Sequence, residues 1–222
     1  MGYRPNDGGT LPSALSQAIE SAYAAMERHP EHMLPPVYRQ AIYRAIGPQS
    51  DPLSHQVLGR LALLSARRVL PIWQRTRPDD HTPERLLATA EDMMSGRWDR
   101  ALDEAVAEQA WDWLTNLKME HSTTFAAHAA VIALFDMLVD VRGNWYGVPG
   151  GGFLEGVSIG QNDMDDKFFD PGICDAAMFA VSAYADPQWD REYDPAKSHE
   201  FWTWWLREAI PTAWATVQES QG

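Results

Sequence analysis

The sequence predicts an all-α protein, a single-domain array of about seven or eight helices. The chain has 222 residues, enough for one well-packed domain and too few to make two the default. Hydrophobic residues make up 45% and charged residues 22%, which is typical of a globular protein. Apolar residues recur at helical spacing between prolines and glycines along most of the chain. We therefore expect one helical domain over 1–222, with the polar, glycine-rich residues 1–10 disordered.

The first two helices are expected before residue 50. A helix over 11–28 is ended by Pro30, and a shorter one begins near Pro36 and ends at Gly47. One face of the first helix is apolar, formed by Leu15, Ile19, Ala22 and Met26.

The strongest helical pattern begins at Asp51-Pro52 and ends at about Arg75. One of its faces carries Leu58, Leu61, Ala62, Ser65, Val69, Ile72 and Trp73. Pro71 lies inside this pattern and should kink the helix rather than begin a new domain.

Three helices are predicted in the middle of the chain. Thr82 is placed as an N-cap before Pro83, and that helix ends at Ser95. The next spans 98–117, with Trp98, Leu102, Ala105, Val106, Trp113 and Leu117 facing inward. The segment 123–141 is apolar on nearly all sides and has no basic flanks, so it predicts a buried central helix rather than a membrane span.

Residues 143–169 break the helical pattern, because they are glycine-rich, aromatic and acidic. A long loop inside a compact domain is uncommon and more often functional than not. Its GFLEGVSIG stretch can form a short β-hairpin. Helix is expected again from Asp170-Pro171 to about Tyr184, followed by a second acidic, aromatic loop over 186–197. A last helix spans 199–217, where Pro211 kinks or splits it.

The negative charge lies almost entirely in the second half of the chain. The net charge is −13; residues up to Lys118 hold 13 basic and 15 acidic side chains, whereas those after it hold 5 and 16. Such a field repels nucleic acid and anionic lipid and attracts cationic surfaces. It predicts a cationic protein partner, no nucleic acid and no membrane, although solubility alone could also account for it.

Several features predict a cytoplasmic protein. No apolar run approaches the roughly 20 residues that cross a bilayer, and the N-terminus lacks the pattern of a secretory signal. The single cysteine, Cys174, cannot form a disulfide within the chain, which fits a reducing compartment.

The short motifs that resemble known sites are incomplete. The glycine run 147–152 lacks the Gly-Lys-Ser/Thr ending of a phosphate loop. The aspartates at 163, 165 and 166 are followed by Lys167 and Phe168 where a calcium loop needs an oxygen ligand and a glycine. His199-Glu200 lacks the second histidine of a zinc protease helix. The sequence therefore predicts no catalytic residue, no cofactor and no metal site.

His128 and Asp136 form the basis of an alternative, in which the chain is a small enzyme. They lie eight residues apart on one side of the expected central helix, beside a pocket closed by the 143–169 loop. About 12 Å of helical rise separates them, so they cannot touch directly. The simpler interpretation is that both are hydrogen-bonded members of the core.

Aromatic residues interleaved with acidic ones occupy the two loops, and this pattern is typical of protein–protein hot spots. The predicted partner-binding residues are Trp145, Tyr146, Phe153, Asp163, Asp165, Asp166, Phe168, Trp189, Asp190 and Glu192. The alternative is that the aromatic residues only pin the loops to the helices. Near the C-terminus, Trp202, Trp204 and Trp205 occupy several sides of one helix and cannot all face inward.

One stretch resembles a known family. Residues 61–99 read LALLSARRVLPIWQRTRPDDHTPERLLATAEDMMSGRWD, and this stretch is similar to the all-helical immunity proteins, family five, of bacterial polymorphic toxin systems. The resemblance implies a protein that neutralises a cognate toxin, for which the acidic surface suggests a basic nuclease. Because residues 78–83 make a turn and begin a helix, the motif assigns no toxin contact. A scaffold with another partner is the remaining alternative.

Overall fold

The computed structural model describes residues 10–48, 51–97, 100–117, 121–138, 175–185 and 193–220. These residues are helical, with no strand among them, and the predicted all-α fold is confirmed. The elements are α1 (Ser13–Arg28), α2 (Pro36–Ile46), α3 (Pro52–Thr76), α4 (Thr82–Met94), α5 (Arg100–Asn116), α6 (His121–Leu138), α7 (Ala176–Tyr184), α8 (Pro195–Trp204), η1 (Trp205–Ala209) and α9 (Ile210–Glu219). The loop and hairpin expected at 143–169 lie outside the described residues.

Aspartate caps begin three of the helices. The carboxylate of Asp51 accepts a hydrogen bond from the Ser54 N–H at the start of α3. Asp175 caps α7 in the same way, and Asp194 caps α8 ahead of a proline. A cap followed by proline at the first helical position satisfies free N–H groups and fixes φ, so the chain enters the helix directly.

The starts of α4, α7 and α8 differ from the sequence prediction. Thr82 is the first residue of α4 rather than its N-cap, because the Asp80 carboxylate already accepts the Thr82 N–H at 3.0 Å. The helix α7 begins at Ala176, later than Pro171. The last helix begins at Pro195 instead of residue 199, because the Asp-Pro pair at 194–195 caps it.

The C-terminal helix contains a π-helical turn. α8, η1 and α9 form one continuous helix, and in η1 the Ile210 N–H bonds to the Trp205 carbonyl five residues earlier. Pro211 follows directly and has no N–H to donate. The wider turn before it relieves the clash between the proline ring and the preceding turn. The predicted split at Pro211 does not occur: the helix continues through the proline, with a π-helical turn before it.

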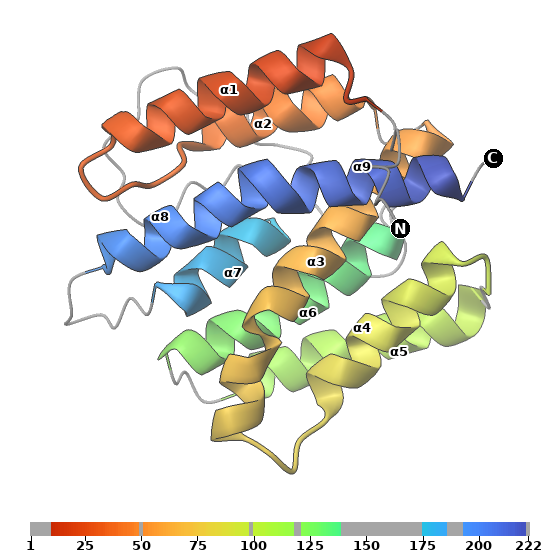
Figure 1. The fold of residues 1–222 in the computed structure, drawn as a ribbon. Helices are drawn as coiled ribbons and strands as arrows, with labels where there is room; N and C mark the ends of the chain where they lie inside the picture. Colours follow the sequence, from red (N-terminus) through yellow and green to blue (C-terminus); the bar gives the residue numbers. More distant parts are fainter. Residues whose placement is uncertain are drawn as a thin grey trace, which may run out of the picture.

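The helices surround a central pair, α3 and α6 (Figure 1). The α1–α2 hairpin lies along one side and packs on the helix formed by α8 and η1. The α4–α5 hairpin lies on the opposite side, and α7 packs against both α3 and α6. Because α6 contacts α3, α4, α5 and α7, it is the buried central helix that its apolar sequence predicts.

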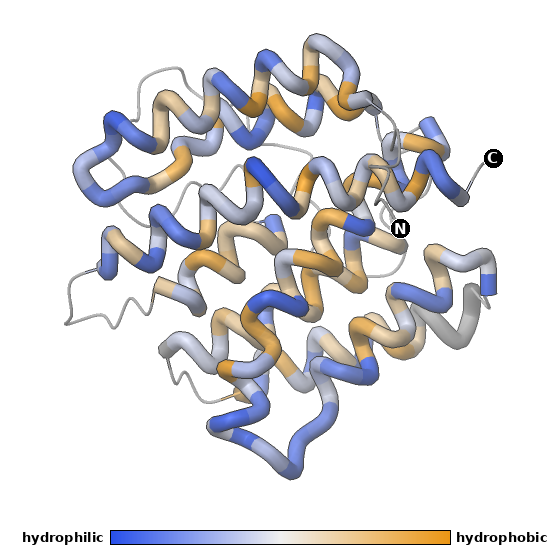
Figure 2. Tube along the Cα trace, viewed as in Figure 1, coloured by the Kyte–Doolittle hydropathy of each residue, from blue (hydrophilic) through white to orange (hydrophobic). Residues whose placement is uncertain are grey.

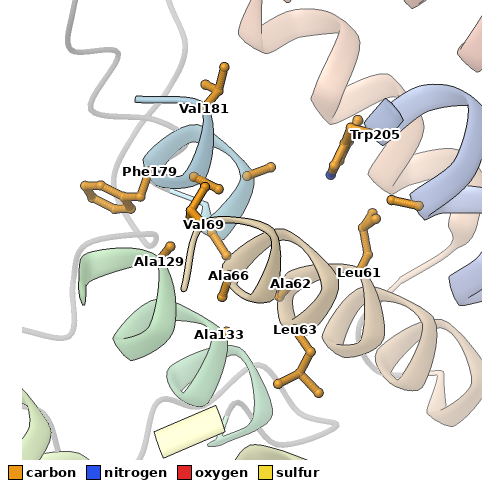
Figure 3. Packing of buried hydrophobic residues seen from close by; sticks show 14 of the residues in the cluster. Leu61, Ala62, Leu63, Ala66, Val69, Ala129, Ala133, Phe179, Val181 and Trp205 are labelled. Atoms are coloured by element: carbon orange, nitrogen blue, oxygen red, sulfur yellow. The ribbon is translucent and has the colours of Figure 1, made fainter. Parts of the chain in front are cut away.

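Hydrophobic residues gather where the helices face one another, whereas the α3–α4 turn is hydrophilic (Figure 2). Small residues let the central helices approach closely: Ala66 of α3 packs toward Ala129 and Ala133 of α6 (Figure 3). On the other side of α3, the Trp205 indole N–H donates to the Ser65 hydroxyl at 3.2 Å. None of the helices that the structure describes is both long and apolar enough to cross a membrane.

Candidate partner-binding surface

All ten residues predicted to bind a partner lie outside the described residues. They are Trp145, Tyr146, Phe153, Asp163, Asp165, Asp166 and Phe168 in one segment, and Trp189, Asp190 and Glu192 in the other. Their role in binding therefore stays a prediction. The structure does show where the helices that flank both segments lie, and so which surface those segments leave and rejoin.

The two ends of segment 186–192 are held together at the α7–α8 corner. The Asp194 N–H donates to the Ala185 carbonyl at 3.4 Å, and Asp194 caps α8. Tyr193 is buried and donates to the Ser198 hydroxyl at 2.9 Å. Tyr193 is an aromatic residue of the second predicted loop, and its side chain belongs to the core.

A groove lies beside this corner, between α3, α7 and α8. It has a volume of about 280 Å³, and its lining comes from segments more than a hundred residues apart in the sequence. The lining residues are Arg68, Pro71, Ile72, Arg75, Tyr184, Lys197 and Glu200. Tyr184 and Lys197 flank segment 186–192 in the sequence, so the groove adjoins the place where that segment leaves α7 and rejoins α8.

Several contacts hold Arg68 at the groove. Its guanidinium forms an ion pair with Glu200 at 3.0 Å and lies 5.4 Å and 5.0 Å from the rings of Tyr184 and Trp204. The Tyr184 hydroxyl donates to the same carboxylate. Burial, together with that hydrogen bond, raises the pKa of Tyr184. Stacking on two aromatic faces fixes a guanidinium that would otherwise be free to rotate.

The groove is basic, although the protein is acidic. Arg68, Arg75 and Lys197 line it, and Glu200 is its one acidic residue. Arg75 and Lys197 are exposed, and neither forms an ion pair with a residue that the structure describes. The described lining therefore carries a net charge of +2, and it can accept carboxylates or other anionic groups from a partner.

A buried polar network fastens α2 to α7. Arg39, whose side chain is 4% exposed, donates to the Asp175 carboxylate at 3.0 Å and to the Leu34 carbonyl at 3.0 Å. The Tyr43 hydroxyl donates to the same carboxylate at 2.7 Å. Sequence reasoning missed this network, because Arg39 and Asp175 lie 136 residues apart. Asp175 directly follows segment 139–174, so the network fixes the point where that segment rejoins the helices.

His128 and Asp136, the pair on which the enzyme alternative rests, lie in different environments. The His128 Nδ1 lies 2.8 Å from the Thr124 carbonyl and so carries the proton, and the ring stacks on Phe179 at 4.9 Å. Burial lowers the pKa of His128. Burial, and then the charge of Asp175, raises the pKa of Asp136 to about 7. The contacts of His128 favour a structural role for that residue.

The tryptophan of the VLPIW stretch closes the α3–α4 turn. Trp73 is buried, its indole N–H donates to the Asp80 carbonyl at 2.6 Å, and its ring meets Trp113 edge to face at 5.3 Å. Asp80 in turn bonds to the first N–H of α4. Trp73 and Asp80 thus hold the α3–α4 turn together from within the stretch 61–99.

No curated protein matches the chain significantly. The family model described as Immunity protein Imm5 matches residues 19–212, which include the groove, the Arg39 network and the Trp73 turn. Because the match covers most of the chain, this protein belongs to the Imm5 family of immunity proteins.

Proposed function

We propose that this protein binds and neutralises a cognate bacterial toxin, through the basic groove together with acidic and aromatic residues of the two loops predicted at 143–169 and 186–197. Membership of the Imm5 family is the observation that carries this proposal. The charge distribution supports it, because residues 136–200 hold 13 acidic and 4 basic side chains. A cationic toxin is the partner that such a surface fits, and a basic nuclease is one example.

The two kinds of charge would act at different stages of binding. The excess of negative charge steers a cationic toxin toward the protein and so speeds association. Arg75 and Lys197, free of ion pairs with described residues, pair with carboxylates of the toxin and set the register of the complex. Aromatic residues such as Trp145 and Phe168 slow dissociation by filling pockets on the toxin. The complex forms in the cytoplasm, where the sequence predicts the protein to reside.

Binding kinetics test the surface. The partner is the toxin encoded beside this gene, carrying an inactivating substitution so that it can be purified. The double variant Arg75→Glu/Lys197→Glu should dissociate at least about tenfold faster, because two interfacial contacts become repulsive. The matched control is Arg44→Glu, an exposed arginine on α2 that should bind like the wild type. If the groove variant and the control bind equally well, the groove is not part of the interface.

The acidic and aromatic segments need variants of their own. Reversing Asp163, Asp165 and Asp166 to lysine should slow association, most strongly at low salt. Trp145→Ala or Phe168→Ala should speed dissociation, at a cost of about 2 kcal/mol or more if the residue is a hot spot. Thermal melting is measured alongside. A large loss of stability in Trp145→Ala would place that residue in the core instead of the interface.

A further inference from the structure

Three potential metal ligands from distant parts of the sequence meet where α1, the α1–α2 connection and α8 converge. They are Glu27 in the last turn of α1, His32 in the connection and His199 on α8. One ligand atom from each lies within 4.8 Å of the other two. The first and last of these residues are 172 positions apart, so no local motif could reveal the cluster.

The contacts within the cluster leave one nitrogen without a partner. The His199 Nε2 lies 2.8 Å from the Glu27 carboxylate, and the rings of His32 and His199 meet edge to face at 4.8 Å. The Nδ1 atom of His32 is buried and has no hydrogen-bond partner. A buried polar atom without a partner costs free energy, so such an atom calls for an explanation.

The α1–α2 connection holds His32 in a strained conformation. His32 is the one non-glycine residue of the described chain with a positive φ, 49°, a region that costs free energy for such a side chain. The Ser198 hydroxyl donates to the His32 carbonyl at 2.9 Å, and the Tyr193 hydroxyl in turn donates to Ser198. The His29 Nδ1 accepts hydrogen bonds from the N–H groups of Glu31 and Met33. These hydrogen bonds hold the backbone in the conformation that places His32 in the cluster.

We propose that Glu27, His32 and His199 bind one divalent transition-metal ion, for which Zn²⁺ is the best match. Two imidazoles and one carboxylate are ligands that zinc commonly uses, and three protein ligands leave a fourth position for water or for a group from a partner. The ion would take one nitrogen of each imidazole, and bonding to the His32 Nδ1 would satisfy that buried atom. It also joins α1, the connection and α8 at a single point.

The cluster can reach metal geometry with small movements. Zinc bonds of about 2.1 Å place tetrahedral ligand atoms roughly 3.4 Å apart. The His199–Glu27 contact must therefore lengthen slightly from 2.8 Å, and the widest separation must shorten. Glu27 is exposed and can supply that movement.

This proposal goes beyond toxin neutralisation and does not depend on it. The test uses the full-length protein without a histidine tag, freed of metal by a chelator and titrated with Zn²⁺ in a calorimeter. We expect one ion per chain and a rise in melting temperature on binding. Co²⁺ offered in place of Zn²⁺ should show the visible absorption of a four-coordinate ion.

Two variants identify the ligands. His32→Gly removes a ligand while accepting the positive φ, so the metal-free variant should melt no lower than the wild type. His199→Ala removes the second imidazole. Each should lower the affinity for Zn²⁺ more than about tenfold, because losing even an outer-shell partner of a metal ligand costs that much. His81→Ala, an exposed histidine on another surface, is the matched control and should bind like the wild type.

Three results would overturn the proposal. They are the absence of a one-to-one zinc isotherm, an affinity that His32→Gly and His199→Ala leave unchanged, and a loss in His81→Ala equal to theirs. In each case the cluster would be a polar contact that joins α1 to α8 without a metal.

Discussion

Arg39 and Asp175 show how single residues hold one end of a long segment against the helices. Asp175 accepts hydrogen bonds from Arg39, Tyr43 and the Met178 N–H, so one carboxylate caps α7 and anchors it to α2. A buried charge is tolerated only when it is paired and hydrogen-bonded. The network therefore fixes the end of segment 139–174, whose aromatic and acidic residues we propose as toxin contacts.

Removing the Arg39 side chain should show how strongly the stability of the fold depends on this network. Arg39→Ala leaves the Asp175 carboxylate buried without its cation, and we expect the free energy of unfolding to fall by about 3–5 kcal/mol. Arg44→Ala on the same helix is the control; that side chain is exposed, so the loss should stay within about 0.5 kcal/mol. Urea denaturation measures both. Equal losses would mean that the buried pair contributes no more than a surface charge.

Asp136 should make stability depend on pH. Its pKa is raised from 3.8 to about 7, so the folded state holds a proton that the unfolded state releases. The contribution is fully present below pH about 4 and is lost as the pH rises through about 7. Three pKa units correspond to about 4 kcal/mol at most.

Asp136→Asn keeps the shape of the side chain and cannot ionise. Relative to the wild type, the variant should gain stability steadily as the pH rises from 4 to 8. The exposed Asp112→Asn is the control and should follow the wild type. The measurement is the unfolding free energy at each pH. Parallel curves for Asp136→Asn and the wild type would show that Asp136 ionises in the folded protein at its ordinary pKa.

At the scale of the elements, the sequence predicts helices best where local chemistry decides the boundary. Pro36 and Asp51-Pro52 begin α2 and α3 as expected, because a proline at the first helical position acts through its own geometry. The start of α4 shifts by one residue: His81 is the N-cap, and the Asp80 carboxylate accepts the Thr82 N–H. At Pro211 the sequence predicts only that the helix is distorted. The π-helical form of that distortion depends on packing.

The end of α2 offers a test at this scale. Gly47 has φ +133°, and a Cβ atom there would collide with the Ser54 hydroxyl. Gly96, after α4, has φ +77° and open space around it. Gly47→Ala should therefore destabilise the protein by about 1–3 kcal/mol, and by more than Gly96→Ala does. Thermal and urea unfolding of both variants measure the difference. Equal losses of stability would mean that backbone strain explains the whole effect and that the clash with Ser54 contributes nothing.

At the scale of the whole molecule, charge and composition indicated a partner, whereas the groove could not be predicted. Its basic residues come from α3 and α8, and only the packing of α7 between them brings Arg75 and Lys197 to one surface. The cluster of Glu27, His32 and His199 escaped prediction for the same reason. Contacts between residues more than a hundred positions apart leave no local pattern in a single sequence.

The central claim is that this protein neutralises a toxin by binding it in a one-to-one complex. The most direct test is to titrate the activity of the purified toxin, encoded beside this gene, with the purified protein. We predict that activity falls linearly and reaches zero at one protein per toxin, with a one-to-one complex by light scattering. A toxin that stays fully active at a several-fold excess of correctly folded protein would contradict the claim.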